Sequence, residues 1–238
     1  DSYGSRGLGD VYKRQNLCQI KATEFLLKQH DNTDFFNLAK SHQNPSLRKI
    51  ALNSEYAKSE DYLNGLKDSS LKVVNLCLEK LNTIAVYLED ENIKQLHEKG
   101  ASIPLLIEHS FHNEGTYFLE LCNDLNPEYR SKLVSLLNNN CQDLENERIK
   151  LLIQNDFKDI IGRWLQGKKS AKMDQLRWEI IEDENVDEIT RAKMLERLFS
   201  RSDENAIKEK AELLIKNSTS ELIITAAQNL STTNSRES

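Results

Sequence analysis

Apolar residues between Thr33 and Asn82 recur every three or four positions, the spacing of one face of an α-helix. The recurrence falls into two blocks of nearly equal length, and in each block a turn separates two short amphipathic segments. The pattern therefore predicts two consecutive helical hairpins, with helices at 33–42, from Asn44 to Leu52, at 59–66 and at 71–81.

The two hairpins are in register with each other. Leu47-Arg48 and Leu71-Lys72 follow the opening of the second helix in their blocks and lie 24 residues apart. A short pair of amphipathic helices cannot bury its apolar face alone, so repeated pairs stack on their neighbours. We expect an all-α fold, specifically an α-solenoid of stacked antiparallel helix hairpins.

The helical period continues along the rest of the chain. Residues 84–88 either extend the preceding helix or form a bent connection, and Gly100 is placed to end a helix that Asp90 begins. Further amphipathic segments predict helices at 17–29, 90–99, 102–115, 116–122, 127–137, 144–153, 157–165, 173–181, 186–199, 206–215 and 222–230. The simplest organisation is one helical-repeat domain over residues 16–230, followed by a polar tail at 231–238.

One helix-opening sequence occurs twice. Asn126-Pro127-Glu128-Tyr129-Arg130 repeats Asn44-Pro45-Ser46-Leu47-Arg48 at an offset of 82 residues. Asn accepts hydrogen bonds from free helix N–H groups, and Pro presets the first helical turn. This arrangement resembles HEAT repeats, chiefly over residues 33–138, although the hairpins are shorter than the usual unit of ~40 residues. The resemblance implies a HEAT-like or armadillo-like helical array.

The N-terminal segment has a different character. Residues 5–15 have no apolar period and resemble the translation of a transposon-end adapter used in shotgun sequencing. We expect residues 1–15 to be a non-native, disordered arm and the chain to be a fragment of a longer protein.

Composition agrees with an all-α chain and limits the function classes. The chain has 38% apolar residues, three prolines and a net charge of −6, and no segment alternates as a strand does. A mildly acidic chain argues against binding a polyanion over its whole surface, although a local basic patch is compatible with it. The sequence has no run of about 20 apolar residues that would span a membrane. We expect a cytoplasmic protein in which Cys77 and Cys122 are small buried residues.

Arg48, Lys72 and Arg130 place a cation at a recurring position of the repeat. These side chains could form a ladder on one face and bind an acidic partner. They could equally pair with an acidic residue of the next hairpin, and pairing within the fold is the favoured interpretation because repeat positions usually serve the architecture.

A second candidate surface combines cations with aromatic rings. Arg163, Lys168, Lys169, Lys172 and Arg177 are interleaved with Trp164 and Trp178. Phosphate contacts from cations and stacking on flat rings are features of single-stranded nucleic-acid binding. HEAT-like DNA glycosylases are built from similar hairpins, but no carboxylate and aromatic arrangement here matches theirs. Both tryptophans fit core positions, so solvated lysines between two core-anchored helices are the favoured interpretation.

Histidines are a third candidate site. His109 and His112 lie three residues apart, with Glu108 and Glu114 beside them and His97 on the preceding helix. Zinc needs three or four converging ligands, and the nearby helix end fits this poorly. We favour solvated histidines at a helix C-terminus. The sequence contains no Gly-rich phosphate loop, Gly-x-Ser-x-Gly or His-Glu-x-x-His.

The sequence therefore predicts a non-enzymatic helical-repeat scaffold without a cofactor, whose partner is another protein or another domain of the same chain. A nucleic-acid-binding or DNA-repair array is the first alternative. An accessory segment of a larger enzyme is the second.

Overall fold

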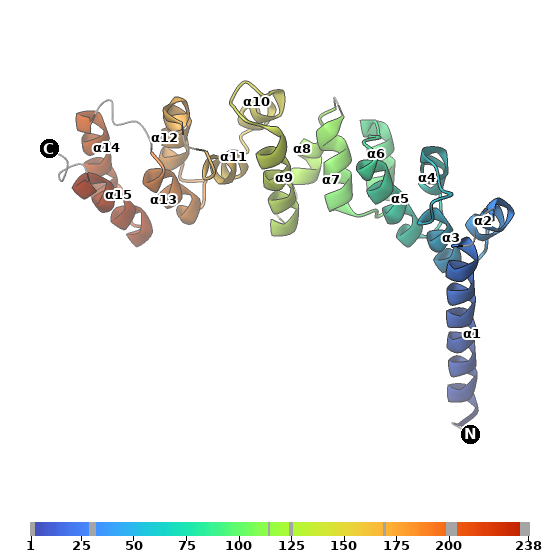
Figure 1. The fold of residues 1–238 in the computed structure, drawn as a ribbon. Coiled ribbons are helices and arrows are strands. Elements are labelled where there is room, and N and C mark those ends of the chain that lie inside the picture. The colour runs from blue at the N-terminus through green and yellow to red at the C-terminus, as the bar shows by residue number, and fades with distance from the viewer. Residues whose placement is uncertain are drawn as a thin grey trace. The chain divides into compact units, whose positions relative to one another are not determined.

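A computed structural model describes residues 3–28, 32–113, 115–123, 126–168, 170–198 and 204–233 (Figure 1). Within these ranges the chain forms fifteen α-helices and one short 3₁₀ helix, and no residue lies in a strand. The all-α prediction is confirmed. The chain divides into two compact units, Asp1–Asp124 and Leu125–Ser238. One helical-repeat domain over residues 16–230 stays a prediction.

Eight helices belong to the first unit. They are α1 (Tyr3–Leu27), α2 (Thr33–Lys40), α3 (Pro45–Leu52), α4 (Ser59–Gly65), α5 (Leu71–Thr83), α6 (Asp90–Glu98), α7 (Ile103–His112) and α8 (Tyr117–Cys122). Helix α3 packs on α5, and α5 packs on α7. The intervening helices each pack on the helix that follows them, α2 on α3, α4 on α5 and α6 on α7. Helix α5 is central, and its Val73, Val74, Cys77 and Leu81 are fully buried.

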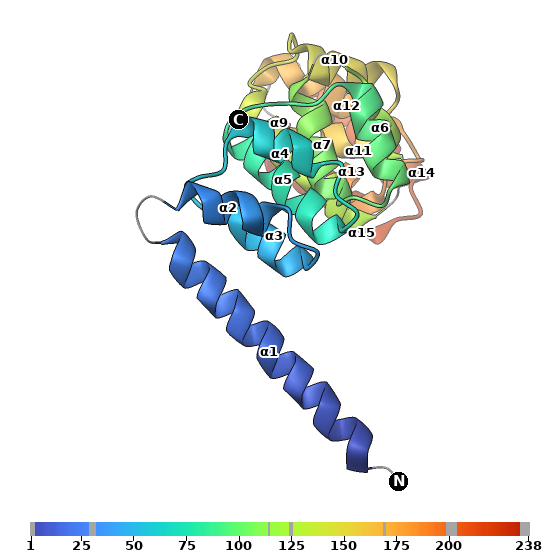
Figure 2. The same ribbon diagram turned by 90° about the vertical axis from the view of Figure 1, so that its right-hand side faces the viewer.

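Helix α1 packs on α2 and α3, and its N-terminal part extends away from them (Figure 2). Thr23 and Leu27 of α1 are buried, whereas Leu17 and Phe25 are exposed. The helix includes residues 3–15, where the sequence predicts a disordered arm. Helical hydrogen bonds are local, and this stretch has no proline to interrupt them. The proposed adapter origin of the segment stays a prediction.

Several helix boundaries follow the predicted local signals. The Asn44 and Asn126 side chains accept hydrogen bonds from the backbone N–H groups of Ser46 and Glu128, both at 3.0 Å, so the two Asn-Pro helix starts are confirmed. Gly100, two residues after the end of α6, has φ of 89°, which glycine adopts without strain. Residues 84–89 form a bent connection, which decides between the two alternatives for this stretch.

The second unit repeats the packing relation of the first. It contains α9 (Pro127–Asn140), α10 (Glu147–Gln154), α11 (Lys158–Leu165), the 3₁₀ helix η1 (Ala171–Met173), α12 (Asp174–Glu182), α13 (Glu188–Glu196), α14 (Glu204–Asn217) and α15 (Glu221–Thr233). Helices α9, α11, α13 and α15 pack on one another in that order. Helices α10, α12 and α14 pack on α11, α13 and α15.

Three of the four cysteines are buried. Cys77, Cys122 and Cys141 are at most 1% exposed, which confirms the prediction for Cys77 and Cys122, whereas Cys18 on α1 is exposed. Burial raises the pKa of the Cys77 thiol to about 12. Burial also raises the pKa of Cys141.

Gly162 allows α11 and α13 to approach each other closely. A Cβ atom added at Gly162 would lie 2.6 Å from Cγ2 of Thr190 on α13. Thr190 cannot rotate away without losing the hydrogen bond that its hydroxyl donates to Asp187 at 2.8 Å. Any side chain at position 162 would therefore push the two helices apart.

We predict that Gly162→Ala lowers the free energy of unfolding of the second unit by about 1 kcal/mol, because overpacking outweighs the higher helix propensity of alanine. Gly167→Ala is the matched control, since its Cβ would have no neighbour closer than 3.8 Å. Urea denaturation of both variants measures the difference. A higher denaturation midpoint for Gly162→Ala would contradict the close packing of α11 on α13.

Candidate functional site

Arg48 on α3 is held by a dense set of hydrogen bonds. Its Nε and Nη2 atoms each donate to a carboxylate oxygen of Asp68 at 2.7 Å. Its Nη1 atom donates to the backbone oxygens of His42 and Gln43, both at 2.8 Å. Asp68 also accepts from the N–H of Ser70 at 2.7 Å, just before α5. Arg48 therefore ties the turn before α3 to the start of α5.

The charges of this pair stabilise each other. Burial opposes ionisation of Asp68, but the hydrogen bonds from Arg48 and Ser70 outweigh it and lower the pKa of the carboxyl group. The hydrogen bond to Asp68 raises the pKa of the Arg48 guanidinium. Both groups are fully ionised at neutral pH, and each neutralises the charge of the other.

Arg130 repeats this relation in the second unit. Its Nη1 atom on α9 donates to the carboxylate of Asp159 in the first turn of α11, and both side chains are largely buried. Pairing within the fold is therefore confirmed for Arg48 and Arg130. Lys72, the third member of the set, is exposed, and within the described ranges its amine makes no ion pair.

We predict that Arg48→Ala lowers the free energy of unfolding by about 2–3 kcal/mol, because it leaves the Asp68 carboxylate without its charged partner. Lys72→Ala is the matched control at the equivalent repeat position, and its effect should stay within about 0.5 kcal/mol. Chemical denaturation of the two variants makes the comparison. Equal effects would contradict the structural role of Arg48.

Arg177 is fully buried rather than part of an interaction surface. Its Nη1 atom donates to Asp174 at 2.6 Å and to the backbone oxygen of Ser170 at 2.9 Å, and its Nη2 atom donates to that of Lys168 at 2.6 Å. The Arg177 side chain thus links α12 to the backbone of the segment that precedes it. The sequence predicts Arg177 to be part of a surface of cations and aromatic rings. This prediction is wrong for Arg177, because its side chain is fully buried.

The two tryptophan rings of the predicted cation and aromatic surface, Trp164 and Trp178, differ in how far they are buried. Trp164 is fully buried, and its Nε1 atom donates to the backbone oxygen of Cys141 at 3.3 Å. Lys168 donates to the same oxygen at 3.0 Å, and its amine lies 5.1 Å from the Trp164 ring centre. Trp178 is only partly buried, and the Lys210 amine lies 4.9 Å from its ring centre. The predicted core position is thus confirmed for Trp164 and only partly for Trp178.

The other cations of this predicted surface differ in their exposure to solvent. Lys172 is exposed, and Lys169 lies outside the described residues. Arg163 is partly buried near Asp187. Burial would raise the pKa of Asp187, but hydrogen bonds from Thr190 and the charge of Arg163 lower it.

His109 is buried in the first unit, so the expectation of a solvated histidine is wrong for this residue. Its Nε2 atom lies 3.0 Å from the backbone oxygen of Leu78, and its buried Nδ1 atom has no hydrogen-bond partner. Burial lowers the pKa of His109. His109 is buried because α7 packs on α5 along the face that carries this side chain, a tertiary contact that the local sequence does not reveal.

The other two histidines make ring contacts. His112 stacks on Tyr87 with 4.7 Å between ring centres, and the His97 Nδ1 atom lies 3.0 Å from the Tyr117 hydroxyl. In the part of the chain that the structure describes, no three His, Cys, Asp or Glu side chains converge as metal ligands.

We predict that His109 makes the first unit less stable as the pH falls below about 6.5. The pKa is lower in the folded state, so the unfolded state binds more protons and stability decreases with acidification. His109→Gln keeps a donor for the Leu78 oxygen and should flatten this dependence. Urea denaturation between about pH 5 and pH 8 tests it. An unchanged slope in the variant would show that His109 does not control the pH response.

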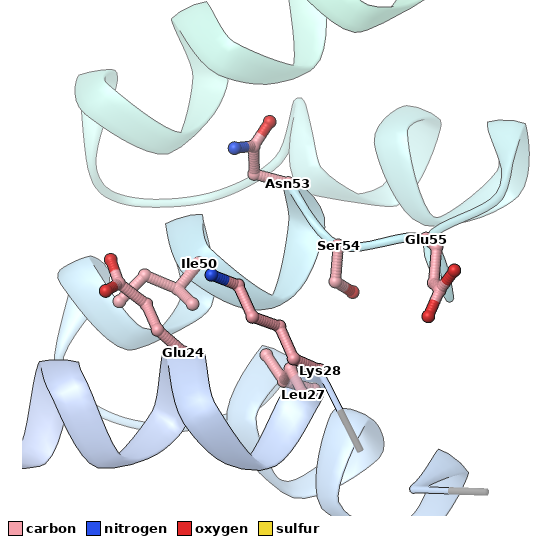
Figure 3. Close-up of a pocket in the computed structure, with 7 residues that line it drawn as sticks. All are labelled: Glu24, Leu27, Lys28, Ile50, Asn53, Ser54 and Glu55. Atoms are coloured by element: carbon pink, nitrogen blue, oxygen red, sulfur yellow. The ribbon is translucent and has the colours of Figure 1, made fainter. Parts of the chain in front are cut away.

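Hollows in the described part of the chain differ in the charge of their lining. One of about 530 Å³ lies beside α1 and α3, and Figure 3 shows Glu24, Lys28 and Glu55 among its lining side chains. One in the second unit, about 410 Å³, is lined by the carboxylates of Glu182, Glu184 and Glu188 and by one cation, Arg191.

A third hollow lies between α4 and α6 and has a volume of about 310 Å³. Its lining contains the lysines Lys67 and Lys99 and no carboxylate. Sequence analysis did not single out these residues. The available signal was a lysine at or just after the end of two predicted helices, those at 59–66 and 90–99, which flank the helix at 71–81.

Comparisons with known proteins leave the function open. No family model, curated protein or solved structure matches the chain. Among the described residues, no helix has both the length and the apolar character needed to cross a membrane.

Proposed function

We propose that the chain is a non-enzymatic HEAT-like or armadillo-like α-solenoid scaffold that binds another protein or another domain of its own chain. The observation that carries the proposal is the repeated packing relation in both units. Every second helix packs on the helix two positions along the chain, and the helix between them packs on its successor. This relation is typical of proteins in which each repeat contacts its neighbours and presents an extended surface.

Charge pairs between successive helix pairs support the same proposal. Arg48 with Asp68 joins α3 to the start of α5, and Arg130 with Asp159 joins α9 to α11. Lys158 on α11 also pairs with Asp183, before α13, at 2.6 Å. These cations hold neighbouring repeats together. Because these cations are already paired within the fold, we expect a partner to bind other residues, namely exposed side chains and the grooves between helices.

The nucleic-acid alternative has less support than the sequence suggests. Arg177 and Trp164, one cation and one ring of the patch, are fully buried. Arg163, Lys168 and Lys172 provide a small cationic surface on a chain of net charge −6. A small basic surface on an acidic chain provides few phosphate contacts.

Two binding assays separate the alternatives. A displayed library of protein fragments is selected against the immobilised folded chain, with heat-unfolded chain as the control. Single- and double-stranded DNA are titrated at about 50 mM and about 200 mM salt.

We predict that specific fragments are enriched on the folded chain alone and that neither DNA binds at low salt. DNA binding that weakens steeply with salt and is lost in Lys172→Glu would support the alternative. Absence of any enriched fragment would contradict the scaffold proposal.

A further inference from the structure

The hollow between α4 and α6, here called the α4–α6 groove, is framed by the packing of the first unit. Helix α4 packs on α5, α6 packs on α7, and α5 packs on α7. These contacts hold α4 and α6 as neighbours and leave a groove between them. The groove is lined by Leu63, Leu66, Lys67, Leu88, Asn92, Gln95, Leu96 and Lys99.

The groove has an apolar base and an exposed apolar wall. Leu88 and Leu96 are 6% and 7% exposed, so they are already part of the protein core. Leu63 on α4 is 41% exposed at the edge of the groove. An exposed leucine beside buried leucines provides apolar area that a docked side chain would cover.

One end of the groove is positively charged. Lys67 follows α4 and is exposed, and Lys99 follows α6. The Lys99 amine donates to the backbone oxygens of Asp68 at 2.5 Å and Leu66 at 3.4 Å, which positions it beside the end of α4. The Asp68 carboxylate is already paired with Arg48. Within the described residues neither lysine amine forms an ion pair, and Asp68, whose charge also interacts with Lys99, is one carboxylate beside three cations, Arg48, Lys67 and Lys99.

The opposite ends of the two helices carry the other sign. Glu60 and Asp61 lie in the first turn of α4, and Asp90 and Glu91 lie in that of α6. Asp61 is paired with Lys40, and Asp90 accepts hydrogen bonds from the backbone of Thr116 and Tyr117. An acidic partner is therefore attracted to the end with the two lysines and not to the opposite end.

We propose that the α4–α6 groove binds a short acidic amphipathic peptide segment of a partner protein. Leucine-type side chains of the segment cover Leu63 and Leu66, and its Asp or Glu side chains face Lys67 and Lys99. The exposed Asn92 amide and the Oε1 atom of Gln95, whose Nε2 atom donates to Glu91 at 3.2 Å, provide polar contacts along the rim. The inference rests on the proposed function, because it specifies which surface of the scaffold binds and which class of segment it takes.

The test uses a displayed library of random peptides of about 12 residues, the length of about three helical turns. The wild-type chain is compared with Leu63→Ser and Lys67→Glu. Lys94→Glu is the matched control, because Lys94 is exposed on α6 and does not line the groove. Circular dichroism first confirms that all variants keep the helical content of the wild type.

We predict that enriched peptides combine leucine-type residues at helical spacing with a cluster of Asp or Glu. Their affinity should fall at least about tenfold in Lys67→Glu and Leu63→Ser and stay unchanged in Lys94→Glu. Increasing salt should weaken binding of the acidic peptides, and a charge-reversed peptide should not bind.

Other outcomes overturn the inference in distinct ways. Basic or uncharged peptides that bind the groove would contradict the role of the two lysines. Self-association of the chain that Leu63→Ser abolishes would assign the groove to a second copy. Peptides or protein fragments that bind all variants equally would remove the groove and leave the scaffold proposal standing. Absence of both enriched peptides and enriched fragments would remove both proposals.

Discussion

Most helices of this chain are too short to be stable alone. Helices α2, α3, α10 and α11 have eight residues each, and α8 has six. Isolated helices below about 12–15 residues are marginal in water, because few hydrogen bonds offset the cost of nucleation. Each of these helices is therefore maintained by the apolar face of its neighbours. The repeated packing of alternate helices is the arrangement that supplies this face throughout each unit.

The charge pairs act within the same constraint. Asp68 accepts from Arg48 of the preceding pair and from the N–H of Ser70 at the start of α5. Asp183 similarly joins Lys158 to the turn before α13 through Asn185. One carboxylate thus both satisfies a backbone donor near a helix start and links successive pairs. The apolar contacts provide stability, and these directional contacts fix which residues of neighbouring pairs meet.

Local features of the fold could be predicted from the sequence, and tertiary ones could not. The Asn44 and Asn126 caps and the Gly100 helix end depend on a few adjacent residues, so their signals are visible in the chain. The burial of His109 depends on the packing of α7 on α5, and Arg177 is held by the path of residues 168–174 before and at the start of α12. The period of a short amphipathic segment shows which side of the helix is apolar, but it does not show which other helix covers that side. The α4–α6 groove was missed for this reason, since its lining comes from two helices that are not adjacent in sequence.

The distribution of thiols makes the two units independently observable. Cys77 and Cys122 are enclosed in the first unit and Cys141 in the second, while Cys18 lies open on α1. A thiol remains unreactive toward alkylating reagents while it is protonated and enclosed. Once Cys18 has been blocked, the rate at which each remaining sulfur reacts reports the opening of its own unit. The alkylation rates of Cys77 and Cys122 therefore measure the opening of the first unit, and that of Cys141 measures the opening of the second.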